Sequence, residues 1–140
     1  MGLDMYLEGR KYFWKNYKAP ENDPIEDGFP LKERVLELGY WRKHPDLHGY
    51  IVKTFADGKD ECQEIYLSEG DIKHIIQAIR DNELPHTEGF FFGTSYQEDI
   101  PGWSKKEVDD ASIHILEGAL KWLQTKQTDV SRSIVYQASW

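Results

Sequence analysis

The chain of 140 residues suits one domain, and its five Trp and eight Tyr give it too many aromatic rings for a disordered protein. Its net charge of −8 argues against general binding to DNA or RNA, because an acidic surface repels phosphate backbones. The single cysteine, Cys62, the absence of a secretory leader and the lack of a long apolar run favour a cytoplasmic protein without disulfides or a membrane span.

The N-terminal part of the chain predicts a strand followed by a loop. Leu3, Met5 and Leu7 alternate with polar neighbours within residues 3–13, which is the two-residue period of a strand with one buried face. Residues 16–30 are polar and contain three prolines, so we expect a loop there.

Residues 31–42 predict a helix. Leu31, Val35 and Leu38 are spaced by four and then three residues, which places them on one helical face. Gly39 is expected to weaken or end this helix, because glycine loses more backbone freedom there than other residues do.

The middle of the chain predicts a second, short helix that Asp46 caps and that residues 56–58 end. Phe90, Phe91 and Phe92 form a brief apolar run that we expect in the core. Two strands are expected, at residues 62–67 and 133–137.

Two further helices are expected to begin at serines that precede an acidic residue by three positions. Ser68 with Asp71 is an imperfect capping box, and Ser104 with Glu107 is a full one. The order of elements predicts a single α+β domain over residues 1–140, with a few-stranded antiparallel or mixed sheet and about four helices packed on it. Its first and last strands are expected to lie side by side.

The densest group of candidate binding residues lies near the expected end of the first helix. It comprises Tyr40, Trp41, Arg42 and Lys43, with His48 shortly after. Arginine binds phosphate or carboxylate through two parallel hydrogen bonds, and flat rings stack on a base, so the group predicts a site for an anionic, planar ligand. The alternative is a helix end whose basic residues offset the helix dipole, with Trp41 in the core.

The C-terminal residues could form a second wall of such a site. Alternation in a final strand places Tyr136 and Trp140 on one face and Gln137 on the other. The alternative is a strand that only seals the core.

Other chemistry has weaker support, and no catalytic residue can be assigned. Metal-ligand candidates are scattered, so we expect neither a bound metal nor another cofactor; they are His44, His48, Asp60, Cys62 and His86. Cys62 lies among acidic residues that hinder formation of a thiolate. No glycine-rich phosphate loop is present. A small hydrolase using His48 with Asp60 or Cys62 remains an alternative.

Four segments together resemble a family of small proteins of unknown function from tailed bacteriophages and prophages. They are Met-Gly-Leu-Asp-Met-Tyr-Leu at residues 1–7, Gly-Tyr-Trp-Arg-Lys at 39–43 followed by His48, Phe-Phe-Phe-Gly at 90–93 and Tyr-Gln-Ala-Ser-Trp at 136–140. The resemblance covers most of the chain in order. It implies a phage origin and no particular reaction.

Three functions remain open. We favour a non-catalytic binder of a small anionic, nucleotide-like ligand, which would act in the host cytoplasm and could counter host defence. The second is an inhibitor that binds a host protein through its acidic surface, and the third is the hydrolase. Nucleic acid and membrane are not expected partners, and a homodimer is left open.

Overall fold

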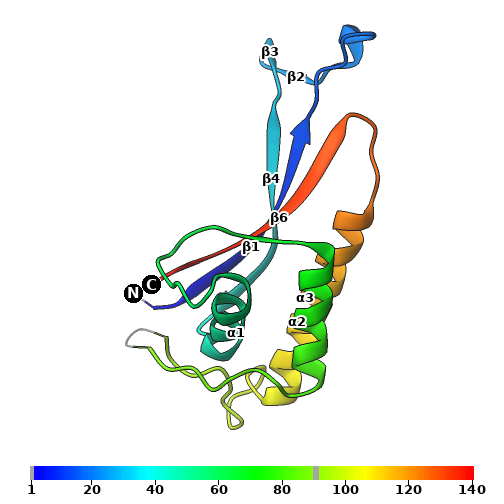
Figure 1. Cartoon of the computed structure of the whole chain (residues 1–140). Coiled ribbons are helices and arrows are strands. Elements are labelled where there is room, and N and C mark those ends of the chain that lie inside the picture. The colour runs from blue at the N-terminus through cyan, green and yellow to red at the C-terminus, as the bar shows by residue number, and fades with distance from the viewer. Residues whose placement is uncertain (1, 90–91) are drawn as a thin grey trace.

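The computed structural model describes residues 2–89 and 92–140 and contains a four-stranded antiparallel sheet with helices against one face (Figure 1). In spatial order the strands are β4 (Glu33–Arg42), β1 (Asp4–Phe13), β6 (Val130–Ser139) and β5 (Ile65–Leu67). The helices are α1 (Pro45–Phe55), α2 (Glu69–Arg80) and α3 (Lys105–Gln124). The short elements are η1 (Pro20–Asn22), β2 (Ile25–Glu26) and β3 (Phe29–Pro30). The expected α+β domain with an antiparallel sheet is confirmed.

The predicted pairing of the first and last strands is confirmed. Leu7 in β1 lies opposite Tyr136 in β6, and both side chains are buried on the side of the sheet that faces the helices. The other face carries partly exposed tyrosines such as Tyr40 and Tyr66. The core therefore forms between one face of the sheet and the three helices.

The prediction of a helix over residues 31–42 is wrong, because this segment forms strand β4. The pairing of β4 with β1 shifts by one residue, so that Leu7 faces Gly39 and the next residue faces Glu37. The extra residue, Leu38, packs on the core with its side chain close to Gly9 of β1. The apolar spacing imitates a helix because Val35 lies opposite Arg10 and is 55% exposed, whereas Leu38 packs on the core at the other face of the sheet.

The expected count of about four helices is also wrong, since the described residues contain three α-helices. The helices that begin after Ser68 and Ser104 are confirmed, and both serines form complete capping boxes. The short helix α1 is confirmed too, but its N-cap is His44, and Asp46 instead accepts a hydrogen bond from the backbone N–H of Thr87. Pro45 therefore stands at the first helical position, where its missing N–H costs nothing.

The predicted loop at residues 16–30 lies at the tip of an arm. Figure 1 shows β1 and β4 running beyond the helices to η1 and the small β2–β3 pair. Within the described residues, no helix is both long enough and apolar enough to cross a bilayer. Of the three phenylalanines expected in the core, Phe92 is buried, whereas residues 90 and 91 lie outside the described part of the chain.

Candidate functional site

A hollow of about 220 Å³ lies between the edge strand β4, helix α3 and the loop before it. We call it the β4-edge hollow. The residues that line it include Tyr40, Trp41, Arg42, His44, Trp103 and Ser112. Three residues of the predicted binding group therefore meet at one place.

Close packing of α3 on β4 sets the back of this hollow. A Cβ atom at Gly39 would lie 2.3 Å from Cγ2 of Ile115, so only glycine allows the helix to approach the strand this closely. Trp41 is buried, and its indole N–H donates to Oγ of Ser112 over 2.9 Å. Trp41 therefore lies in the core, as the alternative interpretation predicted, and it also lines the hollow.

His44 is the least ordinary residue of the site. Its side chain is 2% exposed, and neither ring nitrogen has a hydrogen-bond partner among the described residues. Burial lowers the pKa of His44 from its ordinary value of 6.5 to about 4, although the carboxylates of Asp46 and Asp109 oppose this change. At neutral pH the ring is uncharged, and it offers one donor and one acceptor that no described residue uses.

Further hydrogen-bond donors surround His44. Oγ of Ser95 accepts from the backbone N–H of Asp46, and Oγ of Ser112 accepts from Trp41, yet neither hydroxyl donates to an acceptor among the described residues. Arg42 also lines the hollow, but its half-exposed guanidinium group contacts Asp4 at 3.3 Å on the face of the sheet that carries Tyr40. The site is therefore rich in donors and suits a ligand that carries acceptor oxygens or nitrogens.

The remaining predicted binding residues lie elsewhere. Lys43 adopts a positive φ of 54°, and its side chain packs beside Gly93. The side-chain amide of Gln137 donates to the backbone carbonyl of Cys62 over 2.9 Å. Neither Lys43 nor Gln137 lines the β4-edge hollow.

His48, Tyr136 and Trp140 form a second, buried group with Phe92 and Asp60, which we call the His48 cluster. The Tyr136 hydroxyl lies 2.6 Å from Nδ1 of His48, and Oδ1 of Asp60 lies 2.9 Å from Nε2. The ring of His48 also contacts those of Phe92 and Trp140, with centroids 5.2 Å and 5.8 Å apart. The two predicted walls of one site thus belong to two separate groups.

The hydrogen bonds of the His48 cluster determine its protonation pattern. Burial, assisted by the charge of Asp60, raises the pKa of Tyr136 well above its ordinary value of 10, so its hydroxyl keeps its proton and donates to Nδ1. Nε2 of His48 then carries the hydrogen that binds the carboxylate of Asp60. The ring of His48 is 2% exposed and bonds to Tyr136 and Asp60, but not to Cys62, so the structure joins only the His48–Asp60 pair of the predicted hydrolase and keeps its imidazole buried.

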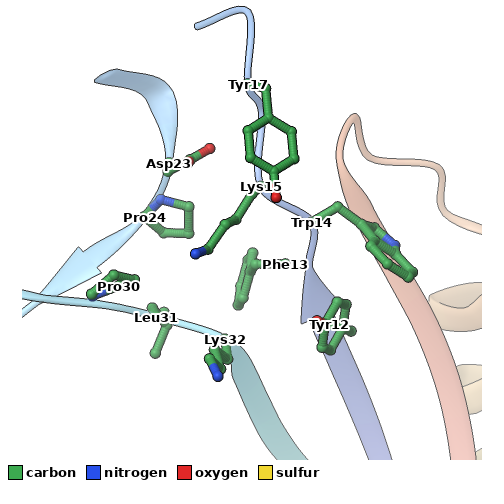
Figure 2. A pocket seen from close by; sticks show the side chains of 10 residues that line it. All are labelled: Tyr12, Phe13, Trp14, Lys15, Tyr17, Asp23, Pro24, Pro30, Leu31 and Lys32. Carbon is green, nitrogen blue, oxygen red and sulfur yellow. The ribbon is translucent and has the colours of Figure 1, made fainter. Parts of the chain in front are cut away.

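A larger hollow of about 420 Å³ lies at the arm tip, and sequence reasoning missed it. Figure 2 shows Lys15 extending into this hollow, with the Phe13 ring beneath it and Trp14 and Tyr17 nearby. One signal in the sequence could have indicated this surface: Trp14 and Tyr17 lie at the border of a polar segment, where aromatic rings have no core to enter.

Neither a metal-ligand arrangement nor a similar known protein assigns a function to either hollow. Within residues 2–89 and 92–140, no group of three or more His, Cys, Asp or Glu side chains is placed to hold a metal ion. Comparison with known proteins found no matching family model, curated protein or solved structure.

Proposed function

We propose that the chain is a non-catalytic binding protein that holds a small anionic, nucleotide-like ligand in the β4-edge hollow. The observation that carries this proposal is His44, whose two buried ring nitrogens have no partner among the described residues. A buried polar group without a hydrogen bond destabilises a fold by roughly 1–3 kcal/mol. A ligand that bonded to His44 would recover this free energy.

The chemistry around His44 supports an anionic, planar ligand. Trp41 and Trp103 supply flat apolar surface. The hydroxyls of Ser95 and Ser112 donate to no acceptor in the described part of the chain, and Arg42 can exchange its exposed contact with Asp4 for a carboxylate or phosphate.

The size of the hollow narrows the ligand. About 220 Å³ is smaller than the roughly 300–1,000 Å³ that drug-sized ligands occupy. We therefore propose that one ring, or one ring edge with its acidic group, enters the hollow while the rest of the ligand lies across the mouth near Arg42. A mononucleotide fits this description better than a dinucleotide enclosed as a whole.

The resemblance to phage proteins supports a biological setting for this binder. We propose that it works in the cytoplasm of a bacterial host as a phage accessory protein. Capture of a nucleotide-like signal there would counter a host defence that depends on that signal.

A thermal-shift screen followed by calorimetry tests the proposal. The panel would contain mononucleotides, cyclic dinucleotides and aromatic carboxylates, and a ligand at a hundred times its Kd should stabilise the fold by about 2.7 kcal/mol. Arg42→Ala should weaken binding of any hit at least tenfold. Arg80→Ala is the matched control, because Arg42 and Arg80 are both 51% exposed and both pair with a carboxylate.

Equal affinities for the two arginine variants would contradict the assignment of the site. No shift from any compound, with the protein well folded, would refute small-ligand binding. It would instead favour the inhibitor that binds a host protein through its acidic surface.

A further inference from the structure

The arm tip leaves several large apolar side chains in solvent. Trp14 is 55% exposed, Ile25 67%, Phe29 72% and Tyr17 88%. They come from both sides of the tip, namely the segment after β1 and the β2–β3 pair. A cluster of exposed apolar side chains of this kind is typical of a surface that another molecule covers.

The hollow at the arm tip adds positive charge to this apolar surface. Lys15 and Lys32 line it, and neither forms an ion pair with another described residue. Its one acidic lining residue, Asp23, accepts a hydrogen bond from the backbone N–H of Asn16. The lining of this hollow therefore carries one net positive charge, and this charge is confined to the hollow, because Glu21, Glu26 and Asp27 lie in the rest of the tip.

Hydrogen bonds hold the arm tip in shape before any partner arrives. The Trp14 indole N–H donates to Oγ of Ser131 over 2.6 Å, and the Tyr12 and Trp14 rings meet edge to face with centroids 4.7 Å apart. Asn16 bonds through its amide to Asp129 and through its carbonyl oxygen to the backbone of the following turn. A surface fixed in this way loses little conformational freedom on binding.

We propose that the arm tip docks an acidic segment of a partner protein. A carboxylate side chain of the partner enters the hollow beside Lys15, and apolar side chains that flank this carboxylate cover Trp14 and Phe29. Charge complementarity with Lys15 and Lys32 favours an acidic partner. Phe29 does not line the hollow, so a small anion that filled the hollow would leave this exposed ring in water.

This interaction is separate from the proposed small-ligand site, because the two hollows share no lining residue. The aromatic content of the arm tip suits the role, since Trp and Tyr supply much of the binding energy at protein interfaces.

Fluorescence anisotropy with a defined probe tests the proposal. The probe is a fluorescein-labelled peptide of alternating Asp and Leu, and a peptide of alternating Lys and Leu serves as its charge control. The double variant Lys15→Glu/Lys32→Glu should weaken binding of the Asp-Leu peptide at least tenfold. Phe29→Ser should weaken it several-fold.

The matched control is Lys53→Glu/Lys121→Glu, which changes the net charge equally at two exposed lysines on α1 and α3. This control should bind the probe within about twofold of the native protein. Equal weakening by both double variants, or stronger binding of the Lys-Leu peptide, would overturn the proposal.

Two further outcomes would replace the partner protein with another occupant. Unchanged affinity of Phe29→Ser beside lost affinity of the lysine variant would indicate a site for small anions only. A native dimer in analytical ultracentrifugation that Phe29→Ser dissociates would identify the arm tip as a contact between copies of this chain. Either result would refute docking of an acidic partner segment.

Discussion

Substitution of the two buried histidines by phenylalanine should change stability in opposite directions. His44 and His48 are each 2% exposed, but only His48 has hydrogen bonds to lose. His44→Phe removes two buried polar atoms without partners among the described residues, and it breaks no side-chain cap of α1. We expect the free energy of unfolding at pH 7 to rise by about 1–3 kcal/mol.

His48→Phe should instead lower the free energy of unfolding by a similar amount, about 1–3 kcal/mol, because it leaves the Tyr136 hydroxyl buried without its acceptor. Urea unfolding at pH 7 measures both changes. The two variants control for each other, since each replaces one imidazole ring by one phenyl ring at the same degree of burial.

The pH dependence of His44→Phe gives a second readout. The pKa of His44 falls from 6.5 in the unfolded chain to about 4 in the fold, so between these pH values only the unfolded chain takes up the proton. Native stability therefore decreases as pH falls from 6.5 to 4, by about 1.4 kcal/mol per unit and about 3 kcal/mol in all. His44→Phe should lack this part of the decrease.

A variant that is less stable than the native protein at pH 7 and keeps the native slope between pH 6.5 and 4 would refute the placement of an unpaired imidazole in the β4-edge hollow. The measurement needs no ligand, so it examines the site independently of any binding screen.

Other substitutions test the packing and the helix starts. Gly39→Ala should destabilise the fold by about 1–3 kcal/mol, because its Cβ would meet Ile115 at 2.3 Å. Gly118→Ala should stabilise it by about 0.5–1 kcal/mol, since no heavy atom lies within 4 Å of the added Cβ and alanine favours a helix. Lower stability of Gly118→Ala, or unchanged stability of Gly39→Ala, in urea unfolding would contradict the packing of α3. Ser104→Ala should cost about 1 kcal/mol by removing the N-cap of α3, and an unchanged urea midpoint would argue against that cap.

Local signals predicted much of the fold. The serine capping boxes and the alternation in β1 depend on neighbours a few residues apart, so they could be read from the chain directly. Strand β4 could not, because the exposed position of Val35 and the bulge at Leu38 both depend on its pairing with β1. The sequence predicts that Gly39 weakens or ends a helix, whereas in the structure its absent side chain makes room for Ile115 of α3.

The candidate site was predicted only where its residues are consecutive. Tyr40, Trp41 and Arg42 lie together in one strand and also line one hollow. His44 follows these residues directly, but its burial could not be predicted, since it comes from contacts with distant elements such as the loop that carries Tyr96. The arm-tip hollow likewise depends on a chain reversal that no short pattern contains.

The place of β6 in the sheet has a consequence for how the chain folds during synthesis. β6 follows every other described element in sequence, yet it lies between β1 and β5, and it pairs Ser139 with Asp4. Until β6 leaves the ribosome, β1 keeps one strand edge open and β5 has no neighbour in the sheet. Such long-range pairing slows folding and exposes an edge that can associate with other chains. The sheet is therefore completed only after β6 has left the ribosome, and the growing chain has most need of chaperones before that point.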